Sequence, residues 1–169
     1  PSTAYVATNA SATFPYDTWA KAASNIQSAL DAVTGTNLQV FVSNGTYNLS
    51  VQLSLVKAVA LRGAGASNTI LQVKGASTRV LYISDPNALV EGLTLRSGLG
   101  LNDIYLAAYG WVAGGGGVSM SGGTIRNCVI RDNYVNYDHM AVAGAVYMTG
   151  GRLEYCNIVS NAIRSNNGR

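Results

Sequence analysis

Residues 122–133 read GGTIRNCVIRDN, and residues 150–161 read GGRLEYCNIVSN. The two segments match at their glycines, their cysteine, one isoleucine and their final asparagine, and every matching pair is 28 residues apart. The same offset relates Val118 to Val146 just upstream. A fixed period of this length is typical of stacked repeats, in which each unit buries its apolar face against its neighbours.

The pattern within one period predicts three short strands joined by tight corners. Apolar and polar residues alternate around Met120 and again around Cys128, and Ile125 stands between two polar neighbours. Glycine pairs and asparagines mark the corners, and no apolar spacing of three and four residues supports a helix. A related segment, residues 90–98, lies 35 residues before 125–133, which leaves room for an insertion. Three strands per winding predict the coils of a parallel β-helix.

This repeat resembles the right-handed parallel β-helix proteins of the pectate-lyase-like superfamily. It is most similar to bacterial secreted and cell-surface members whose coils read Gly-Gly-Thr-x-x-Asn-Cys-x-Ile-x-x-Asn. The resemblance rests on residues 122–133 and 150–161, on 60–71, and on 25–33 followed by the Asn-Gly-Thr-Tyr of 44–47. It implies a right-handed winding over nearly the whole chain. Because the superfamily contains lyases, hydrolases, adhesins and inert scaffolds, it implies much less about function.

The composition suits extended structure with many corners. Only 11% of the 169 residues are charged, and 19 are glycine. The net charge is +3 and its basic residues are scattered, which argues against a nucleic-acid partner. No apolar stretch approaches the ~18 residues of a membrane span. The chain begins at Pro1 without a signal peptide, so we expect a mature or excised piece of an extracellular or cell-surface protein.

We expect one structural domain with two segments: a cap at residues 1–34, and a β-helix of about five coils at 35–169. Its C-terminal end is either truncated, with more repeats following in the natural protein, or covered by another chain. In the cap, apolar residues recur at helical spacing from Trp19 to Val33. This spacing predicts one amphipathic capping helix, with Asp17 or Thr18 as its N-cap, that covers the strand edges of the first coil. The strands predicted in the first coils are 38–42, 47–51, 58–61, 70–73, 80–83 and 90–95.

Leu93, Cys128 and Cys156 form one predicted inward column. Adjacent coils would place the two cysteines within reach of a disulfide, and two cysteines in a secreted chain are consistent with one. Parallel side chains in register point in the same direction, however, which makes the disulfide torsion hard to reach. We therefore favour free, buried thiols.

Glu91, Arg126 and Glu154 align in one predicted outward column. Their charges alternate in sign from coil to coil. Opposite charges on neighbouring strands attract, so we interpret the column as a structural ladder.

The strand that superfamily lyases use for catalysis carries few acidic residues here. The resemblance implies that a lyase would need stacked carboxylates for calcium, yet the counterparts of Asp132 are Ser97 and Ser160. A hydrolase would need paired carboxylates, and the sequence shows no such pair. His139 is the only histidine, which excludes a histidine-based triad or metal site. We therefore expect no catalytic residue, no metal and no cofactor.

Two insertions emerge from the same corner of the predicted coil. Residues 99–115 follow Gly98, and residues 134–143 follow Asn133 one repeat later, so the two loops should lie side by side. Their aromatic and polar side chains suit a sugar ring or a protein partner, but they could equally pack on one another. The candidate ligand-binding residues are Tyr105, Tyr109, Trp111, Tyr134, Tyr137, Asp138 and His139.

Two classes of function are open from the sequence. The favoured one is a non-catalytic extracellular scaffold, adhesive or self-assembling, that binds a glycan or a protein through loops 99–115 and 134–143. The alternative is a polysaccharide lyase or glycoside hydrolase, or a fragment of one. After residue 161 no polar closing segment follows, so we also expect self-association through the last coil.

Overall fold

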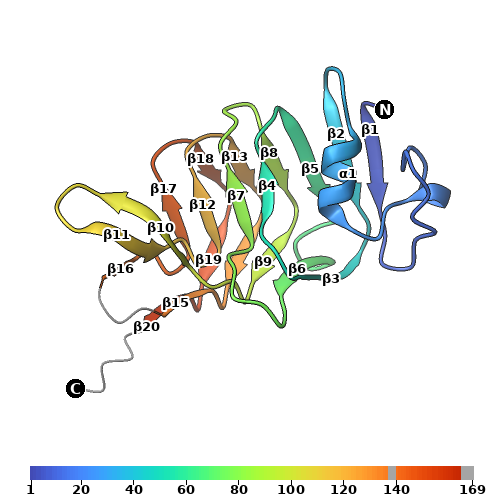
Figure 1. Ribbon diagram of the computed structural model, residues 1–169. Coiled ribbons are helices and arrows are strands. Elements are labelled where there is room, and N and C mark those ends of the chain that lie inside the picture. Colours follow the sequence, from blue (N-terminus) through green and yellow to red (C-terminus); the bar gives the residue numbers. More distant parts are fainter. Residues whose placement is uncertain (137–139, 165–169) are drawn as a thin grey trace.

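The computed structural model describes residues 1–136 and 140–164, and this part of the chain is almost entirely β structure (Figure 1). Most of its strands belong to three parallel sheets. The first sheet contains, in spatial order, β1 (Thr3–Val6), β2 (Leu38–Val42), β5 (Val59–Gly63), β8 (Leu89–Glu91), β13 (Thr124–Arg126) and β18 (Arg152–Glu154). The second contains β3 (Gly45–Leu49), β6 (Thr69–Val73), β9 (Thr94–Arg96), β14 (Val129–Arg131) and β19 (Asn157–Val159). The third contains β4 (Leu53–Leu55), β7 (Leu81–Ile83), β12 (Val118–Met120) and β17 (Val146–Met148).

The order of the strands follows the order of the repeats. The chain passes through the first, second and third sheets in turn and then returns to the first, so that each passage adds one strand to each sheet. The offset of 28 is confirmed as strand register, since Ile125 pairs with Leu153 and Ile130 with Ile158. The offset of 35 is confirmed as well, since Val90 pairs with Ile125.

Aliphatic side chains from successive passages stack inside the three sheets. In the column Leu71, Leu95 and Ile130, none of the three side chains is exposed at all. Burying a side chain of this size contributes about 1.5–3 kcal/mol, so these columns supply most of the folding free energy. The column ends at Ile158, which is 44% exposed.

Two short helices occur where one helix over residues 19–33 was expected. They are the 3-10 helix η1 (Trp19–Lys21) and the α-helix α1 (Ile26–Ala32). The chain between them is extended, because Ala23 forms a parallel bridge with Val6 at the end of β1. The prediction of one continuous helix is therefore wrong: backbone pairing with β1 outweighs the helical spacing.

Of the expected N-caps, Asp17 or Thr18, Thr18 does occupy the N-cap position of η1, but its side chain makes no capping hydrogen bond. Asn25 takes that role for α1, and its side chain accepts the Ser28 N–H at 3.0 Å. The buried face of α1 is formed by Ile26, Ala29 and Leu30. This face packs toward β1, β2 and β4.

Five of the six strands predicted in the first coils are confirmed to within two residues at each end. The sixth, residues 90–95, is two strands, because the chain turns at Gly92, where φ is +69°. Asn127 and Tyr155 occupy the same corner in the next two repeats, with φ of 52° and 53°. These three repeats thus share a left-handed residue at this corner, and asparagine and glycine adopt this conformation most readily.

Cys128 and Cys156 are both free, as expected. Cys128 is buried and Cys156 is half-buried. Burial is the main cause that raises the pKa of the Cys128 thiol to about 12. The reactive thiolate form of Cys128 is therefore rare at neutral pH.

A thiol-reactive dye should accordingly distinguish the two cysteines. At pH 8 we expect the folded protein to label at Cys156 at least about a hundredfold faster than at Cys128, which reacts only when the structure opens. Mass spectrometry of the labelled protein would measure the two rates. The Cys156→Ser variant should stay unlabelled until urea is added, and equal rates in the folded wild type would contradict the buried position of Cys128.

The charged column on the first sheet is confirmed in part. Glu91 accepts a hydrogen bond from Arg126 Nε at 2.8 Å and also pairs with Arg62, which the sequence analysis had not placed in the ladder. Glu154 aligns with Arg126 in register but forms no ion pair among the described residues. The hydrogen bond from Arg126 is the largest cause that lowers the pKa of Glu91; the charge of Arg62 adds to it, and burial opposes it.

This lowered pKa predicts a pH-dependent stability. A carboxyl group whose folded pKa lies below its unfolded value, about 4.3, stabilises the fold above that value and loses the effect as the pH falls through the folded pKa. Glu91→Gln should therefore cost about 1 kcal/mol at pH 7 and much less near pH 3, as measured by urea unfolding. Glu154→Gln is the control and should change little at either pH. A constant penalty for Glu91→Gln across this range would contradict the account.

Candidate functional site

The first insertion forms an antiparallel hairpin that projects from the body of the molecule. It consists of β10 (Leu101–Leu106) and β11 (Gly110–Gly114). A tight turn joins them, in which the Tyr109 N–H donates to the Leu106 carbonyl at 2.9 Å. Figure 1 shows the hairpin in yellow, extending away from the sheets at the end of the molecule opposite α1.

The two faces of the hairpin differ in character, as the alternation of a strand requires. Ile104 and Val112 pair across the strands on the inner face and are 5% and 1% exposed. Tyr105 and Trp111 pair on the outer face and are each 63% exposed. Their ring centroids are 5.5 Å apart with an edge-on angle of 67°. Tyr109, at the turn, is 64% exposed.

An ion pair between a buried arginine and an exposed aspartate holds the base of the hairpin to the body. Arg79 is 1% exposed, and its Nη1 and Nη2 donate to the two carboxylate oxygens of Asp103 on β10, at 3.0 and 2.5 Å. Nη2 also donates to the Gly114 carbonyl on β11 at 3.2 Å. One side chain thus contacts both strands, and the two-pronged contact with the carboxylate fixes their orientation.

The second insertion lies beside the first, as expected. It contains β15 (Tyr134–Asn136) and β16 (Ala141–Val142), and β16 pairs in parallel with β11. The approach is close at Gly114, where an added Cβ would lie 2.6 Å from the Val142 carbonyl oxygen. This contact requires glycine and anchors the hairpin a second time.

The candidate residues do not form one cluster in the described structure. Tyr105, Tyr109 and Trp111 share the hairpin, but Tyr134 lies on β15. The Tyr134 ring is half-buried under the Arg164 guanidinium, at 4.8 Å, where β15 pairs with β20 (Ala162–Arg164). The remaining candidates lie outside the described residues: Tyr137, Asp138 and His139.

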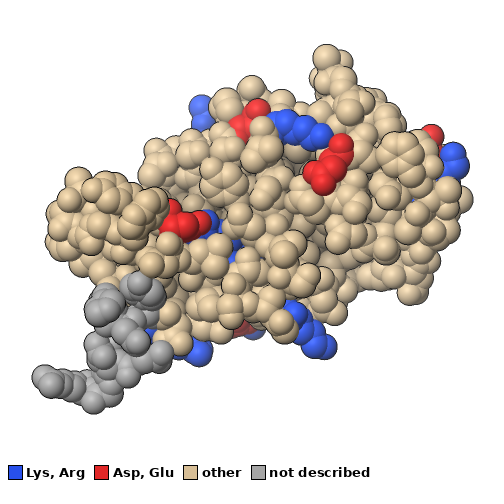
Figure 2. All heavy atoms as spheres, in the orientation of Figure 1, with Lys and Arg blue, Asp and Glu red and all other residues tan. Residues whose placement is uncertain are grey.

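The outer part of the hairpin carries no charge. Asp103, at its base, is the only charged residue between positions 101 and 114. Figure 2 shows the hairpin at the left of the view with neither basic nor acidic atoms beyond its base. An uncharged surface with two exposed rings, an indole N–H and phenolic hydroxyls can stack on an apolar ring face and hydrogen-bond to hydroxyl groups.

The second sheet places Arg131 and Asp132 together but adds no further carboxylate to them. Arg131 Nε donates to Asp132 at 2.6 Å, and this pair is exposed. The equivalent corners of the neighbouring repeats hold Ser97 and Ser160, in the same left-handed conformation as Asp132. Within residues 1–136 and 140–164, no group of three or more metal-ligating side chains occurs.

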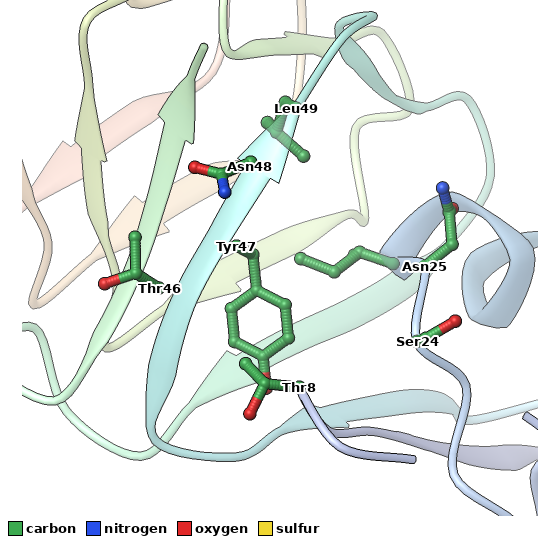
Figure 3. Close-up of a pocket in the computed structure, with 8 residues that line it drawn as sticks. Thr8, Ser24, Asn25, Thr46, Tyr47, Asn48 and Leu49 are labelled. Atoms are coloured by element: carbon green, nitrogen blue, oxygen red, sulfur yellow. The ribbon is translucent and has the colours of Figure 1, made fainter. Parts of the chain in front are cut away.

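A small polar pocket of about 170 Å³ lies between α1 and β3 (Figure 3). Hydroxyl and amide side chains surround it, and the ring of Tyr47 extends from β3 toward Thr8. The Tyr47 hydroxyl already contacts Ser43 Oγ at 2.9 Å, and burial is the main cause that raises its pKa. Tyr47 thus serves the local packing, and no lining residue carries a charge.

No protein-family model, no curated protein and no solved structure matches this chain. Neither helix in the described part of the chain is long and apolar enough to cross a membrane. The geometry of the site is therefore the basis for assigning a function.

Sequence reasoning missed Arg79, the residue that positions the hairpin. A single basic residue between Thr78 and Val80 gives no local signal of burial, and its partner Asp103 is 24 residues away. Sequence reasoning also treated residues 99–115 as a loop. The alternation of Ile104, Tyr105 and Leu106, followed by a turn before Gly110, could have identified the hairpin.

Proposed function

We propose that this chain is a right-handed parallel β-helix, with α1 covering its first coil, that acts as a non-catalytic scaffold outside the cell. Three observations support the winding: the parallel sheets, the addition of one strand to each sheet per passage, and the stacked aliphatic columns. The buried face of α1 toward β1, β2 and β4 supports its role as a cover.

We further propose that the hairpin binds a glycan, and that this is the main activity of the scaffold. The observation that carries the proposal is the exposed pair of Tyr105 and Trp111 on a projection that does not need them for its own stability. Arg79 and the buried pair Ile104 and Val112 already hold the hairpin in place. Large rings left in water without a structural role are typical of binding surfaces.

The absence of charge on the outer part of the hairpin restricts the class of ligand that we expect. An acidic polysaccharide would be attracted to basic side chains, and the hairpin beyond Asp103 has none. Neutral sugar rings have apolar faces that stack on aromatic side chains, and their hydroxyl groups suit the indole N–H and the phenols. A neutral or weakly charged polysaccharide is therefore the expected ligand.

Native gel electrophoresis through gels that contain neutral or acidic polysaccharides would test this proposal. We expect retardation by at least one neutral polysaccharide and loss of retardation in Tyr105→Ala/Trp111→Ala. Tyr155→Ala is the matched control, because Tyr155 is 87% exposed but lies at a corner of the sheets. Equal retardation of the double variant and the wild type would place binding elsewhere.

The same polysaccharides would test the alternative function, a lyase or hydrolase. Incubation with and without calcium, followed by assay for unsaturated or reducing ends, distinguishes binding from cleavage. New chain ends that require the protein would overturn the scaffold proposal.

Self-association is a second candidate function, and a separate observation supports it. The last strands leave a patch of exposed apolar side chains, made up of Met148, Ile158, Val159 and Ile163. Met148, Ile158 and Ile163 line an open apolar cavity of about 440 Å³. The outer backbone edges of β17, β18 and β19 are unpaired in the described structure. Exposed apolar edges of this kind are templates for association.

Light scattering over a concentration series tests this second function. We expect dimers or filaments that shift toward monomer in Ile158→Lys, because a charge at the centre of the patch opposes its burial. The control is Val56→Lys, since Val56 is 62% exposed away from the last coil. A wild type that stays monomeric at high concentration would rule the interaction out.

A further inference from the structure

Three aromatic side chains form a continuous row at the end of the molecule opposite the hairpin. Tyr5 on β1 and Phe41 on β2 are register partners whose rings stack at 5.8 Å with an angle of 23°. Trp19 of η1 also packs against Tyr5, with ring centroids 4.6 Å apart. We call Trp19, Tyr5 and Phe41 the aromatic row. It lies on the outer surface of the first sheet, while Ala4 and Val40 of the same strands point into the core.

The aromatic row opens onto a groove of about 300 Å³. Trp19 and Phe41 form its apolar wall, and Ser43, Asn44 and Arg62 add polar groups. Arg62 on β5 is the register partner of Phe41. Its Nε donates to the Gln39 side chain at 3.0 Å. Its Nη1 pairs with Glu91, and none of the hydrogen bonds between described residues uses its Nη2. The Ser43 hydroxyl is already bonded to Tyr47 and to the Asn44 carbonyl. The groove therefore combines ring faces with the Asn44 amide and an available N–H donor.

The segment that carries Trp19 does not need the indole ring to hold it in place. Backbone and hydroxyl hydrogen bonds already hold the segment that carries it: Ala12 N–H to the Ala22 carbonyl at 3.0 Å, and Ser11 Oγ–H to the Ala20 carbonyl at 2.7 Å. No residue of η1 is buried, and Trp19 is 52% exposed. The indole thus contributes one face to Tyr5 and presents the rest to the groove and to solvent.

The charged side chains around the groove already have partners. Glu91 pairs with both Arg62 and Arg126, and this group of three keeps a net charge of +1. Beside Trp19, Lys21 pairs with Asp17 at 3.2 Å. A ligand at the groove therefore meets hydrogen-bonding groups that suit hydroxyls, the Asn44 amide and Arg62 Nη2, beside the ring faces.

We propose that the aromatic row and this groove form a saccharide-binding site for a neutral oligosaccharide, separate from the hairpin. A sugar ring stacks on Trp19 and Phe41, and its hydroxyl groups hydrogen-bond to the Asn44 side chain and Arg62 Nη2. The inference does not depend on the hairpin, because the two sites lie at opposite ends of the molecule in Figure 1. Two sites far apart on one rigid body would let the protein bridge two glycan chains and gain affinity from both.

The two tryptophans of the chain allow each site to be observed alone. In Trp111→Phe, Trp19 is the only tryptophan, and its fluorescence reports on the aromatic row. The variant is titrated with neutral hexasaccharides of glucose, mannose and xylose and with an acidic galacturonate hexasaccharide, each to about 10 mM. We expect a saturable change in Trp19 emission with at least one neutral hexasaccharide and no comparable change with the acidic one.

Adding Phe41→Ala to Trp111→Phe should weaken this binding at least about tenfold, because it removes the second ring face. Adding Phe14→Leu is the matched control: Phe14 is 70% exposed in the same segment but packs on Tyr16 outside the row. Circular dichroism melts establish that each variant is folded. Trp19 emission that responds to no neutral hexasaccharide, or that responds equally in the Phe41→Ala variant, would overturn the proposal. In Trp19→Phe, Trp111 reports on the hairpin, so failure of one site is distinguishable from failure of the other.

Discussion

Replacing Asn133 with alanine should lower the free energy of unfolding by about 3–4 kcal/mol. Asn133 is 1% exposed at the corner after β14. Its side-chain oxygen accepts the Gly98 N–H at 2.9 Å, and its Nδ2 donates to the Leu95 carbonyl at 3.1 Å and to the Asn161 side chain at 3.0 Å. Alanine leaves the Gly98 N–H without its partner, which costs about 1–3 kcal/mol, and removes the hydrogen bonds to the Leu95 carbonyl and to Asn161, about 0.5–1.5 kcal/mol each.

Asn161 makes the corresponding contacts one repeat later, so the two asparagines form a ladder. It accepts the Asn133 N–H at 3.0 Å and donates to the Ile130 carbonyl at 2.9 Å.

Asn161→Ala should cost about 1–2 kcal/mol, because water can reach this half-buried position. Asn136→Ala, an exposed position on β15, is the control and should cost less than about 0.5 kcal/mol. Urea unfolding followed by circular dichroism would rank the three variants. An Asn133→Ala penalty as small as that of the control would show that the ladder does not stabilise the corner.

Replacing Asp103 with alanine should cost about 3 kcal/mol and loosen the hairpin. The change leaves the Arg79 guanidinium buried without its counter-charge, and a buried unpaired charge is strongly destabilising. The Arg79→Met variant keeps the volume of the side chain and removes the charge. It should therefore cost less than half as much as Asp103→Ala, although it breaks the same ion pair.

The double variant Arg79→Met/Asp103→Ala provides the control for this comparison. It should be more stable than Asp103→Ala alone, because no buried charge is left unpaired. In the Trp19→Phe background, Trp111 fluorescence during urea unfolding would follow the hairpin in each variant. If Asp103→Ala were no less stable than Arg79→Met, the ion pair would not be what positions the hairpin.

The sequence predicted the repeated part of the fold well, because residues that lie one period apart in the sequence pair with each other in neighbouring strands. The offset of 28 alone predicts that Ile130 pairs with Ile158. It also predicts that the two free cysteines occupy equivalent positions in neighbouring repeats. The N-terminal segment was predicted poorly, because the extended chain at Ala23 depends on a partner 17 residues away, Val6. Strand β4 was missed although Leu53 and Leu55 alternate with Ser54 and pair with β7 at the same offset of 28 residues.

For the candidate site, the sequence identified where the insertions begin and that they lie side by side. It could not assign side chains to faces, since that depends on the hairpin register that pairs Tyr105 with Trp111. Tyr134 was grouped with these residues because the two insertions start at equivalent corners, yet its ring lies against Arg164 on β20. The aromatic row was missed for a similar reason, because Tyr5, Trp19 and Phe41 come from three separate elements.

The most direct test of glycan binding by the hairpin is a fluorescence titration of Trp111. In the Trp19→Phe variant, Trp111 is the only tryptophan, and a polysaccharide that retards the protein in a gel should change its emission in a saturable way. Adding Tyr105→Ala should weaken the binding at least about tenfold, whereas adding Tyr155→Ala should leave it unchanged. Trp111 emission that stays constant while the protein binds the polysaccharide would contradict the account.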